Sequence, residues 1–240
     1  MAPETENMLD LIGAEEGWSC LDIGCGPRGI TDLLSDRVGS AGCVVGLDMN
    51  AEFIKHASAS ANSNTRFVQG DAYSPELAPG SFDLVHMRFL ASTAGNAERL
   101  LDEAIRLARP GGFVALQEPD ATTLNCYPPH PAWDKLKSAL LGAFSGVGAD
   151  LELARRLYWV VKQSVLEDVQ FRPFIIGVRS NDSMVDYLPA TVESLRGTVL
   201  DLRLLGEHEL DTLLAECRHH LAAPTTSFTM YTVAQVWGRK

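Results

Sequence analysis

Short apolar runs alternate with helical patterns along the first half of the chain. Between the runs, apolar residues recur every three or four positions, as they do on one face of a helix. We expect strands at 18–23, 42–48, 65–69, 81–87 and 113–117, with helices at 4–16, after Gly29, after Asn50 and at 97–108. Strands that are apolar throughout and separated by helices predict a parallel sheet covered on both faces.

The pattern changes after Glu118. Residues 119–131 contain four prolines and form a stretch too long for a simple connection. Helical patterns follow at 133–144, 151–165, 184–195 and 209–221, and extended apolar patterns at 169–178 and 227–237. We interpret 1–240 as a single domain, in which 1–118 is one half and 119–166 and 181–223 are insertions that form a helical cap.

Composition and charge narrow the classes of partner. Hydrophobic residues make up 46% of the chain and charged residues 21%, as in an ordinary soluble protein. A formal net charge of −11 argues against nucleic acid or an anionic membrane surface as the main partner. Five scattered cysteines without a CxxC pair, and no apolar segment long enough to span a membrane, favour a cytoplasmic protein. No metal site is indicated.

Polar and glycine residues gather where the predicted strands end. The first strand runs into the glycine turn 24–29, the second ends at Asp48, the third is followed by Asp71, and the fourth ends at His86. Ligands of open parallel sheets bind at these carboxyl ends, where an acid after the second strand can accept both hydroxyls of a ribose. The letters of the turn also fit GxGxxG, a motif shared by dinucleotide binders.

Five motifs in this order resemble the class I S-adenosylmethionine-dependent methyltransferases, in particular small-molecule enzymes of the quinone C-methyltransferase type. They occupy roughly 18–118, in the segments 21–27, 45–48, 70–72, 82–85 and 109–112. The resemblance implies an α/β fold with a Rossmann-like doubly wound sheet, mostly parallel with an antiparallel last strand, and makes 1–118 the half that binds S-adenosylmethionine.

The resemblance also implies roles for single residues. Asp48 would accept the ribose hydroxyls, Met49 would pack on the adenine, and Asp71 would receive the adenine amino group. The expected cofactor-binding set is Asp22, Gly24, Cys25, Gly26, Arg28, Asp48, Met49, Gly70, Asp71, Ala72, His86 and Met87. Arg28 stands where the family often has glycine. It could reach the cofactor's carboxylate or point to solvent.

Two residues are candidates for catalysis. Glu118, after the fifth strand, could be a general base or bind a cationic acceptor, or it could hydrogen-bond to backbone in an irregular loop. His86 could also be a base, or a structural hydrogen-bonding residue.

We expect the acceptor at the rim formed by the fourth and fifth strands and the proline-rich loop. The predicted substrate-binding residues are Arg88, Asp120, Tyr127, His130 and Trp133. The apolar helices of 119–166 and 181–223 could form a lid over the acceptor or bury a face in a homodimer.

The predicted function is methyl transfer to an O, N or C atom of a small apolar or aromatic metabolite. Alternatives are another reaction of the same cofactor, such as a cyclisation, a non-catalytic nucleoside-binding regulator, or a nicotinamide-dependent oxidoreductase. Such an oxidoreductase should have an active-site Tyr-xxx-Lys; Tyr127 and Tyr187 lack a lysine four residues later, whereas Tyr158 has one at Lys162.

Overall fold

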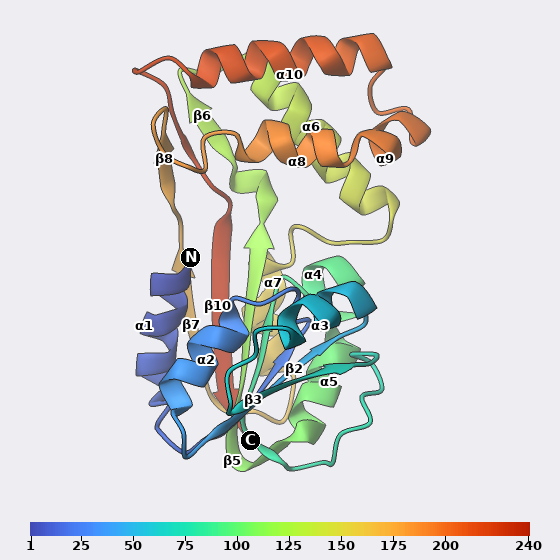
Figure 1. Ribbon diagram of the computed structural model, residues 1–240. Coiled ribbons are helices and arrows are strands. Elements are labelled where there is room, and N and C mark those ends of the chain that lie inside the picture. Colours follow the sequence, from blue (N-terminus) through green and yellow to red (C-terminus); the bar gives the residue numbers. More distant parts are fainter. The chain divides into compact units, whose positions relative to one another are not determined.

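The computed structural model describes residues 1–240, which divide into two compact units (Figure 1). The first, which we call the sheet unit, comprises 1–118, 155–173 and 234–240. The second, the insert unit, comprises 119–154 and 174–233. The chain therefore passes between the units four times, and the role of any segment as a cap stays a prediction.

A seven-stranded sheet in the order β3-β2-β1-β4-β5-β10-β7 is the centre of the sheet unit. Neighbouring strands from β3 to β5 run parallel. The last strand, β10, runs antiparallel to β5, because Lys240 at its end exchanges backbone hydrogen bonds with Gly111 and Gly112 near the start of β5. The predicted fold class is thus confirmed. The strands are β1 Ser19–Ile23, β2 Cys43–Asp48, β3 Thr65–Gln69, β4 Phe82–Arg88, β5 Ala108–Asp120, β7 Glu167–Phe174 and β10 Thr232–Arg239.

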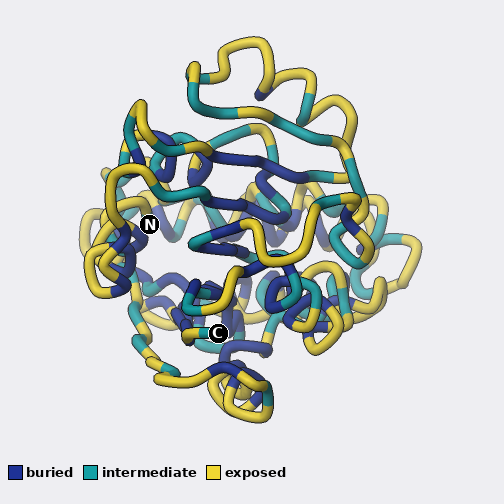
Figure 2. Tube along the Cα trace, turned by 90° about the horizontal axis from the view of Figure 1, so that it is seen from below, coloured by how far each residue is buried: buried dark blue, intermediate teal, exposed yellow.

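Helices cover both faces of this sheet. On one face, α1 (Ala2–Ile12) and α2 (Ile30–Val38) pack their apolar residues against Cys20, Leu84 and Trp237. The alternate strand residues, such as Leu21 and Val85, point to the opposite face and are also buried. Figure 2 colours the trace by burial, with buried stretches in dark blue and exposed ones in yellow. The remaining helices of the sheet unit are α3 Ala51–Ser58, α4 Ala91–Ala94, α5 Ala97–Leu107 and α7 Ala154–Lys162, the last beginning at the boundary residue. No helix of the chain has the length and apolar character that crossing a membrane requires.

The insert unit combines helices with a small antiparallel sheet. Its helices are α6 Pro131–Gly146, α8 Tyr187–Ser194, α9 Arg196–Asp201 and α10 Glu207–Leu221, preceded by the 3-10 turn Ala121–Thr123. The sheet has the order β6 (Asn125–Tyr127), β9 (Ser227–Thr229), β8 (Gly177–Arg179). Trp133 of α6 packs on Phe228 of β9 with ring centres 4.9 Å apart, which joins the helical layer to the small sheet.

Two predicted strands divide in the structure. The extended pattern at 169–178 forms β7 in the large sheet and β8 in the small one, and that at 227–237 forms β9 and β10 in the same way. An apolar extended run has the same sequence pattern in either sheet, so the pattern could not reveal the transfer. The short elements β6, α4 and α9 were not predicted, because each has too few residues to show a period.

Gly46 provides a test of how closely β2 packs beneath the glycine turn. A Cβ atom there would lie 2.6 Å from the Phe67 ring and 3.0 Å from Cys25 Sγ. We expect Gly46→Ala to lower the free energy of unfolding by about 1–3 kcal/mol, the usual cost of overpacking. In Gly197→Ala a Cβ meets nothing within 4 Å, and this matched change in helix α9 should be neutral or stabilising. Urea unfolding measures both variants; equal effects would contradict this packing.

Candidate active site

The turn after β1 depends on backbone conformations that favour glycine. Gly24 has φ +72°, and a Cβ there would lie 2.9 Å from the Leu90 side chain. Its N–H donates to the carbonyl oxygen of Leu47 at 2.7 Å, so the turn is bonded to the end of β2. Cys25 shares that carbonyl. Burial, together with the nearby carboxylates of Asp22 and Asp48, raises the pKa of its thiol, which therefore stays protonated.

Asp48 joins the glycine turn to the start of α3. One oxygen of its carboxylate accepts the N–H of Gly26 at 2.9 Å, and the other accepts the N–H of Asn50 at 2.9 Å. Asn50 in turn caps α3 by accepting the N–H groups of Glu52 and Phe53. The carboxylate is half-buried, and each oxygen keeps a further lone pair that can accept a hydroxyl.

The ends of β2 and β3 are linked by main-chain and side-chain bonds. Gly70 N–H donates to the Asp48 carbonyl at 3.0 Å, and Gln69 Nε2 donates to the Met49 carbonyl at 3.2 Å. The Met49 side chain is 80% exposed beside this edge. Asp71 and Ala72 follow in a turn in which the Asp71 carboxylate accepts the N–H of Tyr73 at 2.8 Å. The structure thus brings the predicted residues 48–49 and 70–72 to one edge of the sheet.

Arg28 is engaged with a neighbouring acid. Its guanidinium lies 2.8 Å from Asp32 in the first turn of α2 and also bonds to Ser60. The Asp32 carboxylate raises the pKa of the guanidinium. Arg28 has φ +144°, a conformation that costs a non-glycine residue energy. The structure therefore places the predicted cofactor contact in an ion pair across the start of α2.

His86 and Asp22 form a buried pair at the ends of β4 and β1. His86 Nδ1 lies 2.9 Å from Asp22 Oδ1, and Thr31 Oγ1 donates to Asp22 Oδ2 at 2.7 Å. Both His86 and Asp22 are buried, and Met87, the next residue of β4, is completely buried as well. The imidazole lies against protein on both ring nitrogens, since its Nε2 is 2.8 Å from Gln117 Nε2.

Glu118 is buried at the end of the β5 segment that belongs to the sheet unit. Its carboxylate accepts the N–H groups of Ala91 and Ser92, at 2.9 and 3.1 Å, and so caps the start of α4. Burial raises the pKa of the carboxyl from 4.5 to about 7, although these hydrogen bonds oppose the shift. Leu90, next to the capped residues, is the side chain that closes on Gly24, so Glu118 supports the loop that borders the glycine turn.

The predicted substrate-binding residues lie in different environments. Arg88 ends β4 with its guanidinium 5.6 Å from the Phe89 ring centre. In the insert unit, Asp120 is buried and accepts the Thr122 N–H, and His130 caps α6 and stacks on His220. Trp133 is 1% exposed in the core of that unit, whereas Tyr127 is 73% exposed.

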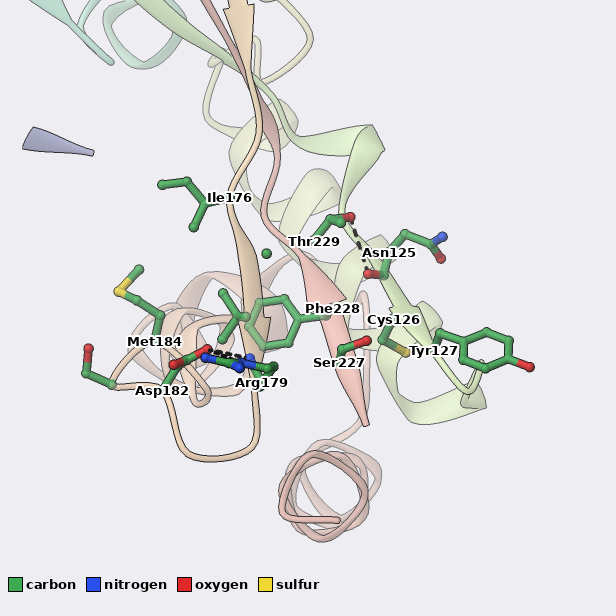
Figure 3. Close-up of a pocket in the computed structure, with 13 residues that line it drawn as sticks. Asn125, Cys126, Tyr127, Ile176, Arg179, Asp182, Met184, Ser227, Phe228 and Thr229 are labelled. Carbon is green, nitrogen blue, oxygen red and sulfur yellow. Dashed lines mark hydrogen bonds and ion pairs between the residues drawn. The ribbon is translucent and has the colours of Figure 1, made fainter. Parts of the chain in front are cut away.

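Tyr127 borders an open groove on the small sheet of the insert unit. The groove has a volume of about 690 Å³ and is lined by residues of β6, β8 and β9 and of the turn before α8. Figure 3 shows Tyr127 at one end, and Ile176 and Met184 on the far side of Phe228. Arg179 and Asp182 form an ion pair in its wall. The groove therefore offers apolar and aromatic side chains together with polar edges.

Sequence reasoning missed several residues that shape these contacts. Gln117, the polar residue that ends the run 113–117, binds His86 Nε2, and Thr31 binds Asp22. Leu90 closes on Gly24 through a loop without a motif of its own. A polar residue inside an apolar strand pattern was the available signal for Gln117, because such a residue is buried only where it finds a partner.

Part of this chain is similar to known methyltransferases. Residues 20–112 match the family described as "Methyltransferase domain". The demethylmenaquinone methyltransferase of Lactococcus lactis is 34% identical over 48% of this chain and 48% of its own length. The nocamycin O-methyltransferase of Saccharothrix syringae is 31% identical over 49% and 43%. This chain thus spans less than half the length of these relatives.

A solved structure extends the likeness of fold to the whole chain. The Haemonchus contortus phosphoethanolamine N-methyltransferase 2, in complex with phosphomonomethylethanolamine and S-adenosylhomocysteine, matches with a TM-score of 0.60. The match covers 99% of this chain and 53% of that one at 15% identity. At that identity the likeness concerns the fold alone.

The pKa of Glu118 predicts a dependence of stability on pH. A carboxyl whose pKa rises on folding stabilises the folded state fully below pH 4.5 and loses that contribution as the pH rises through about 7. Relative to Glu118→Gln, which mimics the protonated form, the wild-type chain should therefore become less stable from pH 5 to 8, by at most about 1.4 kcal/mol per pH unit.

Urea unfolding at several pH values measures this difference. Glu98→Gln, an exposed change in the first turn of α5, controls for loss of a negative charge. Parallel stability profiles of the wild-type chain and Glu118→Gln would contradict the raised pKa.

Proposed function

We propose that this chain is a class I S-adenosylmethionine-dependent methyltransferase, which transfers a methyl group from S-adenosylmethionine to a small metabolite. The Asp48 carboxylate carries the proposal most directly. Main-chain N–H groups of Gly26 and Asn50 hold it at the edge of the sheet, and its spare lone pairs suit a pair of ribose hydroxyls.

The neighbouring residues fit the rest of the cofactor. The open backbone of Gly24 and Gly26 can approach the methionine part closely. Met49 offers an exposed apolar side chain for the adenine, and Asp71 and Ala72 lie at the end of the adjacent strand for its amino group. The complex of the Haemonchus enzyme with S-adenosylhomocysteine supports the same cofactor class.

The protein's own contribution is binding and alignment. The cofactor supplies an activated methyl group on a positively charged sulfur. The chain holds that cofactor against the glycine turn and orients the acceptor, because correct alignment of the reacting atoms removes much of the barrier. We assign His86 and Glu118 to positioning, since both are completely buried and engaged with Asp22 or with the start of α4.

For the acceptor we propose a largely apolar or aromatic small molecule that is methylated at oxygen, nitrogen or carbon. The matched relatives, a demethylmenaquinone methyltransferase and a nocamycin O-methyltransferase, support this class. The groove beside Tyr127 supports it independently, because it combines exposed aromatic and aliphatic side chains with a few polar groups.

Ligand-dependent stabilisation tests the cofactor assignment. S-adenosylhomocysteine should raise the Tm of the chain and NAD should not, because a ligand that binds only the folded state stabilises it. Asp48→Ala should weaken S-adenosylhomocysteine binding by about 1–3 kcal/mol, measured by calorimetry, since the ribose hydroxyls lose their acceptor.

Two variants sharpen this test. Asp48→Asn keeps one acceptor oxygen and should fall between the wild-type chain and Asp48→Ala. Asp36→Ala removes an exposed acid from α2 and should leave binding unchanged. Stabilisation by NAD alone, or affinity of Asp48→Ala within twofold of the wild-type value, would overturn the assignment.

The proposed acceptor surface makes a separate prediction. Tyr127→Ala should reduce methylation of a quinone or phenol acceptor, followed by mass spectrometry, while the affinity for S-adenosylhomocysteine stays unchanged. The side chain is 73% exposed, so its removal should cost little stability. Tyr158→Ala, a change of the same size in the sheet unit, is the control. Equal turnover in both variants would place acceptor binding elsewhere.

A further inference from the structure

A row of buried polar side chains crosses four adjacent strands of the large sheet. Asp22, His86, Gln117 and Gln235 lie on β1, β4, β5 and β10, and none is more than 2% exposed. Side chains two residues apart on a strand share a face, so the row lies on the face covered by α1 and α2. The core residues that stand two positions away are Cys20, Leu84, Ala115 and Trp237.

Hydrogen bonds join this row to Arg172 of β7. Arg172 Nη1 donates to Gln235 Oε1 at 2.7 Å, and Gln235 Nε2 donates to Gln117 Oε1 at 2.8 Å. Gln117 Nε2 lies 2.8 Å from His86 Nε2, and His86 Nδ1 lies 2.9 Å from Asp22 Oδ1. We call these five side chains the relay. All five belong to the sheet unit.

The arginine gives the relay a direction. A guanidinium can only donate, so Gln235 must turn its oxygen to Arg172 and its NH₂ group to Gln117. The backbone carbonyl of Glu4, which can only accept, receives the second N–H of Gln235 at 2.9 Å and requires the same orientation. Gln117 must then present its own NH₂ group to His86, with its second N–H bonded to Thr5 Oγ1 at 3.1 Å.

The relay also determines the tautomer of the His86 imidazole. Because Gln117 donates to it, His86 Nε2 must accept and carry no proton, so the single ring proton lies on Nδ1 and points to Asp22. Asp22 Oδ1 then always receives an N–H, while Oδ2 receives the hydroxyl of Thr31 in the first turn of α2.

We propose that Arg172 and Gln235 are positioning residues that hold His86 in its Nδ1–H tautomer and thereby keep the Asp22 carboxylate in place beneath the glycine turn. The tautomer follows from the hydrogen bonds alone. The consequence for cofactor binding rests on the proposed function, because it requires that the turn 24–29 binds S-adenosylmethionine.

Long-range ¹H–¹⁵N correlation spectra of the ¹⁵N-histidine-labelled chain test the tautomer directly, since they distinguish protonated from bare ring nitrogens. The wild-type chain should show a proton on His86 Nδ1 and a bare Nε2. A proton on Nε2 in the wild-type chain would overturn the proposal.

Gln235→Glu should reverse the direction of the relay. The new carboxylate can accept from Arg172 but has no N–H for Gln117, whose NH₂ group should then turn toward it. Gln117 Oε1 would face His86 Nε2, which should gain a proton. Gln170→Glu adds the same charge at an exposed position of β7 and should leave the His86 spectrum unchanged. An unchanged spectrum in folded Gln235→Glu would overturn the proposal.

A second variant covers the case in which Gln235→Glu does not fold. Gln235→Leu removes the relay without adding charge, and Gln117 can then adopt either orientation. His86 should show signals of both protonation patterns at Nε2. The wild-type tautomer alone in this variant would show that Arg172 and Gln235 do not determine it, and would overturn the proposal.

Calorimetry with S-adenosylhomocysteine tests the consequence for the turn. A changed His86 spectrum should accompany a loss of affinity on the order of fivefold. An affinity within twofold of wild type would overturn the positioning role. A wild-type chain with the predicted tautomer that binds no S-adenosylhomocysteine would contradict the proposed function and still support the relay.

Discussion

The buried carboxylate of Asp22 is the interaction on which this half of the molecule depends. It stands at the end of the first strand and binds the start of α2 through Thr31 and the fourth strand through His86. A buried carboxylate is tolerated only where hydrogen bonds compensate for its loss of water. The elements that supply these bonds must therefore pack around it in one arrangement. The glycine turn leaves β1 directly after this point, and Asp48 holds the other side of that turn.

The strands of the large sheet were predictable because a local run of apolar residues marks each of them. The five expected strands of the first half all form, and 65–69 has the predicted limits. Asn50 caps α3 as expected, because a short polar side chain directly before a helix can accept the free N–H groups of its first turn. The edge formed by Asp48, Met49 and Asp71 was also predictable, since parallel strands bring their carboxyl ends together.

Contacts between distant segments were not predictable in the same way. Glu118 and His86 were candidates for catalysis, and the sequence left open whether they face a ligand or the protein. Their surroundings are built by Ala91, Ser92 and Gln117, which no spacing rule connects to them. The two strands that divide between sheets show the same limit, because extended apolar residues suit either sheet.

The place of β10 has a consequence for how the chain is made. This strand follows the other six strands of the sheet in the sequence, and it lies between β5 and β7. Until it enters, Arg172 has no link to Gln117, and the sheet has a gap between two strands that were completed earlier. A nascent chain therefore cannot complete the sheet before residues 232–239 leave the ribosome, and pairings this distant in sequence form slowly. Assembly of the sheet unit therefore waits until the insert unit between its segments has been synthesised.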